Sequence, residues 1–294
     1  FDIGFSLIDY DGSYSYARAF LVGLLNTLLV SFIGILIATL IGVTIGIGRL
    51  SSNFLVAKFS EVYVEIFRNI PLLLQLFFWY FAALRALPLP ENAINFYDIS
   101  YLTVKGWYVP KFIWNNFSIF LYSIIAAIVA IIFVSRYAKK QREELGKHIP
   151  TFYFGIGLLF AIPALSFLIG GVTLEFEIPV LEQMSTTIFN FRGGVSIIPE
   201  LMSLALALSM YTATFIAENV RAGILGVGKG QKEAAASIGL NNTQILKLVV
   251  LPQALRIIIP PTTNQYLNLT KNSSLAAAIA YPDLVLVFAG TALM

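Results

Sequence analysis

The stretch that decides the fold class runs from Ala19 to Gly48 and reads AFLVGLLNTLLVSFIGILIATLIGVTIGIG. It contains no charged residue, and it is longer than the roughly 20 apolar residues that a helix needs to cross the hydrocarbon core of a bilayer. The composition of the whole chain agrees with a membrane-spanning segment here, because 58% of the residues are hydrophobic and only 12% are charged. A soluble domain carries about 25% charged residues. The sequence therefore predicts an integral membrane protein.

Five further segments have the composition of membrane-spanning helices. The last of them contains prolines and charged residues, and there we expect one spanning helix followed by a broken, re-entrant piece, because irregular backbone at membrane depth needs cover from protein or water. The expected fold class is therefore all-α, a polytopic transmembrane helical bundle. The five segments are Val62–Leu84, Phe112–Ser135, Ile149–Leu174, Ile197–Ala217 and Ile245–Ala280, the last interrupted at Pro252, Arg256, Pro260, Pro261 and Lys271.

Lysine and arginine are distributed unevenly between the two sides of these spans. The positive-inside rule places the more basic connections in the cytoplasm. We therefore expect the first residues to lie outside and the connection 219–247 to lie in the cytoplasm. The basic residues after the first, third and fifth spans are Arg49, Lys58, Arg136, Lys139, Lys140, Arg142, Lys147, Arg221, Lys229, Lys232 and Lys247, whereas the other side has Arg18, Lys105, Lys111 and Arg192.

Several classes of function find no support in the composition. The chain has no cysteine and a single histidine, His148, so we predict no metal site, and its net charge of +3 gives no reason to expect a nucleic-acid partner. Gly223–Lys229 has the spacing of a phosphate-binding loop, but Gly230 follows where that motif needs Ser or Thr. The sequence shows neither a motif of paired carboxylates nor a nucleophile combined with a base, so nothing in it suggests an enzyme. No signal peptide begins at Phe1, so we expect the sequence to start inside a longer chain.

The connection 228–240 is the most informative polar segment. It reads GKGQKEAAASIGL, and its alanine run favours a short helix. Gly239 stands where a helix end often adopts a positive φ, and Asn241 can cap a second helix that begins near Thr243. A helix, a glycine turn and a second helix between two membrane spans suit docking to a partner protein. A plain amphipathic connector has the same pattern, and both interpretations stay open here.

This segment also resembles the EAA motif of the permeases of binding-protein-dependent ABC transporters. Other blocks, in the same order along the chain, are similar to the subfamily that imports polar amino acids, such as histidine, glutamine and glutamate. The resemblance covers roughly residues 15–87 and 196–294. The blocks are Tyr63-Val64-Glu65-Ile66-Phe67-Arg68-Asn69-Ile70-Pro71-Leu72-Leu73, Glu233-Ala234-Ala235 with Gly239, Leu251-Pro252-Gln253-Ala254-Leu255-Arg256, Pro260-Pro261, and Lys271-Asn272-Ser273-Ser274-Leu275.

The resemblance implies a type I ABC importer permease in the bacterial inner membrane. Such a chain would bind no cofactor itself, because ATP and magnesium would be bound by two partner ATPase subunits. It would also work with a second permease subunit, with a periplasmic amino-acid-binding protein and within the lipid bilayer. The implied coupling residues are Gly230, Gln231, Glu233, Ala234, Ala235 and Gly239. The alternative that the sequence leaves open is an ion-coupled secondary amino-acid transporter.

The middle of the chain departs from the minimal family pattern. We expect three parts: residues 1–87 with the first two spans, 88–195 with inserted outer loops and an extra transmembrane hairpin, and 196–294 with the permease core. This enlarged form resembles one subunit of the broad-specificity L-amino-acid permeases, which favours a related chain, and not a second copy, as the partner permease. The family has a further spanning helix beyond Met294, so we expect a truncated end.

Two groups of polar residues are further candidates. Glu65 with Arg68 and Glu218 with Arg221 are i,i+3 pairs of opposite charge, which either neutralise each other locally or form a gate behind the coupling loop. The second group either lines a pathway for amino acids or caps a broken helix. It consists of Gln75, Lys271, Asn272, Ser273 and Ser274.

Overall fold

In a computed structural model of the chain, residues 3–146, 150–185 and 188–292 are described. They form two compact units, the first made of residues 3–94, 102–107 and 197–292, and the second of residues 95–101, 108–146, 150–185 and 188–196. Within the described residues, five helices are long and apolar enough to cross a membrane, and a bent pair brings the number of candidate spans to six. The predicted fold class, a polytopic helical membrane bundle, is confirmed.

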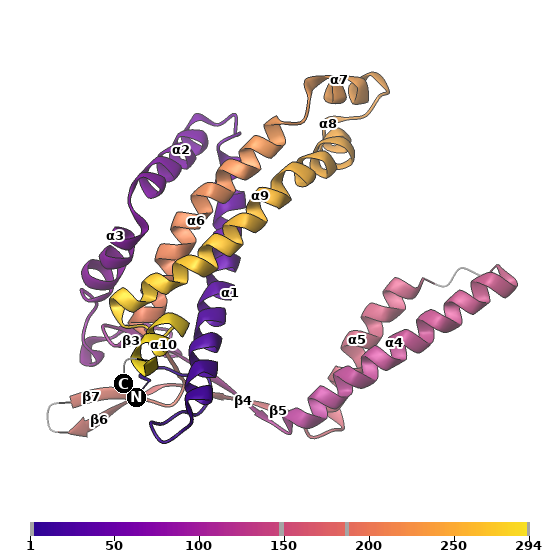
Figure 1. The fold of residues 1–294 in the computed structure, drawn as a ribbon. Coiled ribbons are helices and arrows are strands. Elements are labelled where there is room, and N and C mark those ends of the chain that lie inside the picture. Colours follow the sequence, from indigo (N-terminus) through magenta and orange to yellow (C-terminus); the bar gives the residue numbers. More distant parts are fainter. Residues whose placement is uncertain (1–2, 147–149, 186–187, 293–294) are drawn as a thin grey trace. The chain divides into compact units, whose positions relative to one another are not determined.

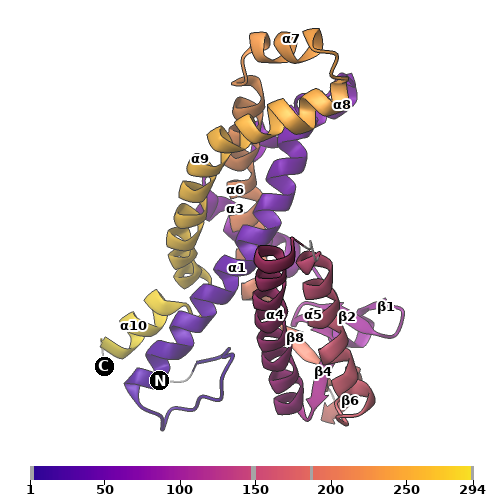
Figure 2. The same ribbon diagram turned by 90° about the vertical axis from the view of Figure 1, so that its right-hand side faces the viewer.

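The first unit is built from helices that pack around α6 (Figures 1 and 2). Its shorter helical pieces include a π-helical turn at Phe78–Leu84 and 3-10 turns at Pro90–Asn92 and Ser273–Ile279. The α-helices are α1 (Tyr16–Gly48), α2 (Phe54–Asn69), α3 (Leu72–Phe77), α6 (Pro199–Leu225), α7 (Lys229–Ser237), α8 (Asn242–Gln244), α9 (Leu251–Asn272) and α10 (Leu284–Ala292), with a π-helical segment at Ile245–Val250 joining α8 to α9.

Small residues allow α1 and α6 to pack closely. A Cβ atom added to Gly42 would lie 2.6 Å from Cβ of Ile216, and one added to Gly46 would lie 2.8 Å from the carbonyl oxygen of Ala217. In lipid, where no hydrophobic effect drives helices together, such close approach provides the attraction. The Gly42-xxx-Gly46 spacing therefore fixes the central helix pair of this unit.

The expected span Val62–Leu84 is wrong as a single helix. Helix α2 ends at Asn69, and α3 with its π-helical continuation to Leu84 leaves at an angle of 102°. The break falls at Ile70-Pro71, because Pro71 has no N–H to continue the helix and restricts the residue before it. Gln75, 4% exposed, spans the bend by donating from Nε2 to the carbonyl oxygens of Phe67 (2.7 Å) and Ile70 (2.9 Å). It therefore satisfies carbonyl groups that the bend leaves without helical partners.

The last predicted span is less interrupted than its sequence indicates. Helix α9 runs without a break through Pro260 and Pro261 to Asn272, and the 3-10 turn prolongs it to Ile279. The chain then turns at Ala280, which has a φ of +60°, and α10 begins at Leu284. A proline pair in a membrane helix is tolerated when neighbouring helices support it. The irregular backbone therefore falls at 280–283, later than the sequence suggests.

The second unit contains the hairpin of α4 (Phe117–Leu145) and α5 (Thr151–Leu168). Both helices differ from the expected spans. The segment before Phe117 and the segment after Leu168 belong to strands β4 (Lys111–Asn115) and β5 (Thr173–Glu177), which pair in antiparallel register. The basic residues 136–142, expected in a loop, lie on the last turns of α4 instead.

Short strands make up most of the rest of the inserted region, and the sequence did not reveal them. Strands β6 (Val180–Ser185) and β7 (Ile188–Arg192) form a second antiparallel pair. A further four-stranded sheet has the order β1-β2-β3-β8. Its strands are β1 (Ile94–Phe96), β2 (Ser100–Thr103), β3 (Gly106–Val109) and β8 (Val195–Ile197).

Candidate functional site

The α7–α8 hairpin, residues 226–244, joins the ends of α6 and α9 (Figure 1). Helix α7 ends in a Schellman motif, in which the N–H of Gly239 donates to the carbonyl oxygen of Ala236 (3.0 Å) and the N–H of Leu240 donates to that of Ala235 (3.2 Å). Gly239 has a φ of +86°. The predicted helix and its glycine turn are thus confirmed, and they form a defined protrusion.

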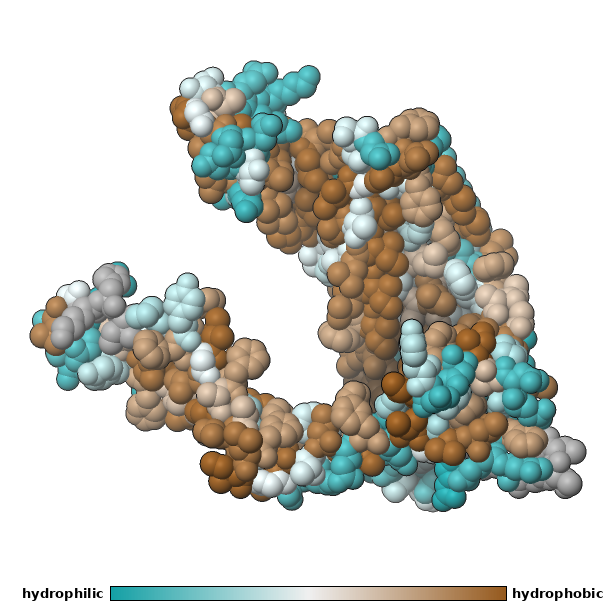
Figure 3. Space-filling view, turned by 180° about the vertical axis from the view of Figure 1, so that it is seen from behind, coloured by the Kyte–Doolittle hydropathy of each residue, from teal (hydrophilic) through white to brown (hydrophobic). Residues whose placement is uncertain are grey.

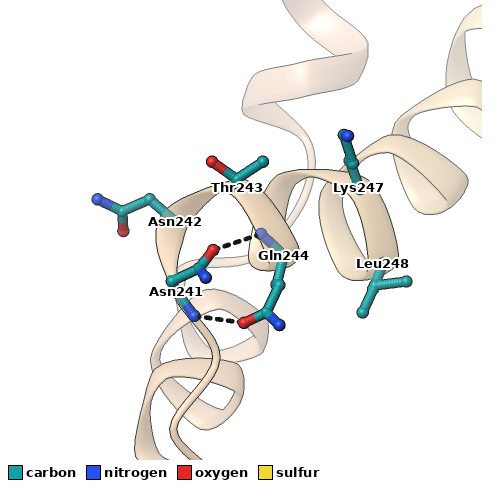
Figure 4. Close-up of a pocket in the computed structure, with 6 residues that line it drawn as sticks. All are labelled: Asn241, Asn242, Thr243, Gln244, Lys247 and Leu248. Carbon is teal, nitrogen blue, oxygen red and sulfur yellow. Dashed lines mark hydrogen bonds between the residues drawn. The ribbon is translucent and has the colours of Figure 1, made fainter.

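Helix α8 begins with a capping box. The side-chain oxygen of Asn241 accepts from the backbone N–H of Gln244 (3.0 Å), and the side-chain oxygen of Gln244 accepts from the backbone N–H of Asn241 (2.9 Å), as the dashed lines in Figure 4 show. The cap predicted at Asn241 is confirmed. An open depression of about 540 Å³ lies beside it, lined by Asn241, Asn242, Thr243, Gln244, Lys247 and Leu248.

A small hydrophobic cluster attaches this hairpin to both membrane helices. Ala235, on α7, packs with Val227, Ile245, Val250 and Ala254, and Leu240 packs against the same cluster. Because Ala235 is 5% exposed, a larger side chain there would push α7 away from its support. This cluster therefore fixes α7 against the segments that adjoin the ends of α6 and α9.

The outer face of the hairpin is left uncovered. Gly230, Gln231, Glu233, Ala234 and Gly239 are exposed, so among the predicted coupling residues only Ala235 faces inward. Ile238, which sequence reasoning missed, is 78% exposed beside them. An apolar side chain at the centre of a polar protrusion is typical of a docking contact with another protein.

A network of charges connects the helix ends near the hairpin. Glu218 on α6 accepts from Arg221 (3.3 Å) on the same helix, as the i,i+3 spacing predicts, and from Arg49, the residue that follows α1. Arg49 was not among the predicted residues, because its partner is distant in sequence. Within the described residues Glu65 and Arg68 form no ion pair with each other, and both side chains are exposed. Only one of the two predicted pairs is therefore formed.

The predicted pathway residues occupy different environments. The hydroxyl groups of Ser273 and Ser274 donate to the carbonyl oxygens of Thr270 (2.7 Å) and Lys271 (2.9 Å), so they are used by the helix itself. Lys271 is exposed and Asn272 is half-buried. The Nε2 of Gln75 is used at the α2–α3 bend, whereas its Oε1 is buried without a hydrogen-bond partner among the described residues. A contact between these residues and an amino acid stays a prediction.

The stretch with phosphate-loop spacing begins inside α6 and continues through a short turn into α7. Gly223 lies within α6, where an added Cβ would collide with Ile258 of α9. Its glycine serves close helix packing and not phosphate binding. Within the described residues, no group of three or more potential metal ligands is found.

A bundle of membrane helices with a structured, exposed hairpin between two of its core helices defines a polytopic membrane protein with a candidate docking surface. The sequence profile described as "Binding-protein-dependent transport system inner membrane component" matches residues 144–293. The chain belongs to this family, and the predicted resemblance to amino-acid ABC transporter permeases is confirmed.

Individual relatives support the assignment over almost the whole chain. The chain is 49% identical over 288 residues to the "Putative amino-acid ABC transporter permease protein YhdX" of Escherichia coli K12, covering 98% of this chain and 72% of the relative. It is 51% identical over 288 residues to the "General L-amino acid transport system permease protein AapQ" of Rhizobium johnstonii, covering 98% and 71%. The similarity thus includes the inserted middle region.

Among solved structures, the fold is similar to "Crystal structure of an amino acid ABC transporter with histidines". The TM-score is 0.50 at 19% sequence identity, with 95% of this chain and 79% of that chain covered. At this identity the match supports the fold alone.

Proposed function

We propose that this chain is a permease subunit through which an ABC importer moves L-amino acids into a bacterial cell. The observation that carries the proposal is the exposed α7–α8 hairpin, which is fixed to two core helices by its own hydrophobic cluster. The relatives named as amino-acid permeases supply the substrate class. One of these relatives is a permease of a general L-amino-acid transport system, which supports broad substrate specificity.

The chain needs partners for this activity. Two ATPase subunits bind ATP and Mg²⁺ and receive the α7–α8 hairpin, while this chain binds no cofactor and hydrolyses nothing. A periplasmic binding protein delivers the amino acid at the opposite end of the bundle. A second permease subunit, a related chain, completes the pathway. The complex lies in the inner membrane, with the hairpin in the cytoplasm, as the distribution of lysine and arginine predicts.

Coupling follows from the packing of the hairpin. When the ATPase subunits close on ATP, they move α7, and its contacts with Ile245, Val250 and Ala254 move the near end of α9. The bond from Nε2 of Gln253 to Oε1 of Gln231 (3.4 Å) adds a polar link between the same elements. Because α9 is continuous from Leu251 to Asn272, movement at one end is transmitted along the helix. The matches to ABC permeases favour this mechanism over the secondary transporter that the sequence left open.

The test is reconstitution of the complex with its partners in proteoliposomes, with a panel of L-amino acids offered on the side of the binding protein. We expect uptake that requires ATP on the side of the hairpin, together with ATP hydrolysis that increases when substrate is added. The isolated chain should hydrolyse no ATP. Hydrolysis by the isolated chain, or uptake driven by an ion gradient without ATP, would contradict the proposed function.

A further inference from the structure

One face of α9 carries polar side chains that have no partner within the described part of the chain. Asn264, Asn268 and Lys271 are exposed, and no hydrogen bond or ion pair of their side chains is found among the described residues. All three lie within the candidate span Asn242–Ile279. We call this set the α9 polar stripe.

Helical geometry places these three residues in one line. At about 100° per residue, positions 264, 268 and 271 fall within an arc of about 60°, and their Cα atoms extend over roughly 10 Å along the axis. The opposite side of the helix is packed, since Thr262 is 7% exposed and Leu269 is fully buried. The stripe is therefore the side of α9 that faces away from its own unit.

A lipid environment does not suit this stripe. An unpaired amide in hydrocarbon costs several kcal/mol, and asparagine is too short to reach the headgroups as a lysine near a helix end does. Two threonines of α9 satisfy their own hydroxyl groups, because Thr263 and Thr270 donate to the carbonyl oxygens of Ile259 (3.0 Å) and Tyr266 (3.1 Å). The amides of the stripe have no such internal solution, so they need water, a solute or another protein.

We propose that the α9 polar stripe lines the amino-acid pathway and binds the charged groups that all free amino acids share. The ammonium group of Lys271 offers a partner for the substrate carboxylate. The amides of Asn264 and Asn268 provide both N–H donors and carbonyl acceptors, so they interact with the carboxylate or with the substrate ammonium group. Because the stripe binds only these common groups, amino acids with different side chains are accepted as substrates. The inference rests on the proposed function and assigns residues to it.

The serines that follow in the sequence are not part of this site. Their hydroxyl groups are used by the end of the helix, which leaves Lys271 as the member of the Lys271–Ser274 block that projects from the bundle. A stripe packed only against a second permease is the competing explanation. It is less favoured because a lysine in such an interface needs an acidic partner, whereas a substrate carboxylate meets the same need in a water-filled pathway.

Cysteine accessibility tests the proposal directly, because the chain has no cysteine of its own. Single cysteines are introduced at Asn264, Asn268, Lys271 and, as the control, at the exposed Leu267 on the neighbouring face. The complete complex, with cysteine-free partners, is treated with a membrane-impermeant methanethiosulfonate reagent. We expect labelling at the three stripe positions, slower labelling when L-glutamine or L-glutamate is transported, and no labelling at Leu267. Absence of labelling at Asn264 and Asn268, with and without ATP, would overturn the proposal.

Transport by substituted complexes provides the second test. Asn264→Leu and Lys271→Met should raise KM for uptake about tenfold or more, which corresponds to the loss of one charge-assisted hydrogen bond of about 1.5–3 kcal/mol. Thr263→Val, on the same helix but another face, should change KM less than about twofold, because its hydroxyl serves only the helix backbone. An unchanged KM in Lys271→Met, or release of the second permease by Asn264→Leu, would show that the stripe is not a substrate contact.

The proposed function and the assignment of the α9 polar stripe to the pathway would be contradicted by different results. If the wild-type complex imports no amino acid but the stripe positions react with the reagent, the proposed substrate class is wrong. The assignment of the stripe to a water-accessible pathway is then still supported. If the wild-type complex imports amino acids and the stripe positions do not react, the function stands and the stripe assignment is wrong.

Discussion

Helices α6 and α4 are both apolar enough to cross a membrane, yet they have opposite surroundings. In the most apolar window of α6, 67% of the residues are buried within the structure, whereas in that of α4 the proportion is 6%. Helix α6 buries mainly small residues, among them Ser203, Ala207, Ser209 and Ala213. Helix α4 exposes large ones, such as Phe117, Tyr122 and Phe133. Residue size therefore separates a helix made to pack from one made to contact lipid.

The surface of the two regions shows the same contrast. In Figure 3 the α4–α5 hairpin is brown along most of its length and hydrophilic only at its tip, as expected of a hairpin surrounded by acyl chains. Helix α9 exposes amides and an ammonium group within its span. The contrast agrees with the proposal that the coupling and pathway residues belong to the first unit, whereas the large exposed apolar residues of the hairpin are suited to contact with lipid. Substitutions in matched pairs test this contrast.

The largest effect is expected from Gly42→Leu in α1. Its Cβ would lie 2.6 Å from Ile216, so the helix pair has to separate. Overpacking of this kind costs typically 1–3 kcal/mol and sometimes more. The matched control is Gly157→Leu in α5, where no atom lies within 4 Å of the added Cβ. We expect Gly42→Leu to lose most of the assembled complex in size-exclusion chromatography, and Gly157→Leu to retain it. Equal losses would contradict the assignment of the hairpin to lipid.

A smaller effect is expected at the bend between α2 and α3. Gln75→Met removes two hydrogen bonds to backbone carbonyl groups at nearly constant volume, and unsatisfied buried acceptors cost about 1–3 kcal/mol. Gln141→Met, on exposed α4, removes only a side-chain bond of 3.2 Å to Tyr137 and should cost less than about 0.5 kcal/mol. Thermal unfolding of the purified complex measures both. A melting temperature unchanged by Gln75→Met would mean that the bend does not depend on this side chain.

The smallest difference concerns the ion pairs. Arg49→Gln breaks a link between α1 and α6 in which the Arg49 side chain is 17% exposed, and Glu218 keeps only Arg221, so we expect a loss of about 1 kcal/mol. Lys139→Gln in α4 removes an exposed pair with Glu143 and should cost less than about 0.5 kcal/mol. Urea titration of both variants in detergent compares them. A greater loss in Lys139→Gln would reverse the expected order.

The sequence predicted the local structures whose causes are local. The α7 helix, the positive φ of Gly239 and the Asn241 cap each depend on residues within a few positions, and all three are present. Five of the six predicted spans correspond to single helices long and apolar enough to cross a membrane, and the sixth is the bent pair of α2 and α3. The small-xxx-small spacing of Gly42 and Gly46 is compatible with the close approach of α1 and α6, but the spacing alone does not identify the partner helix.

Features that depend on distant residues were missed or misplaced. The 102° bend at Ile70-Pro71 is stable because Gln75 reaches back across it, which a hydropathy pattern does not reveal. Arg49 and Glu218 are separated by 169 positions, so their pairing has no sequence signal. The strands of the inserted region are too short to have a clear alternating pattern. The α9 polar stripe was present in the sequence, but the broken helix expected there hid its periodicity.

The central claim, that the α7–α8 hairpin couples this chain to an ATPase, is tested most directly by uptake and ATP hydrolysis in Gly239→Asp. Gly146→Asp is the matched control, since Gly146 also follows a helix, has a φ of +67° and has no atom within 4 Å of an added Cβ, as is true of Gly239. Both substitutions cost about 1–2 kcal/mol for the left-handed backbone.

We predict that Gly239→Asp abolishes substrate-stimulated ATP hydrolysis and uptake while the chain still inserts, and that Gly146→Asp retains both. Normal uptake by Gly239→Asp at normal expression, or equal losses in the two variants, would contradict the account.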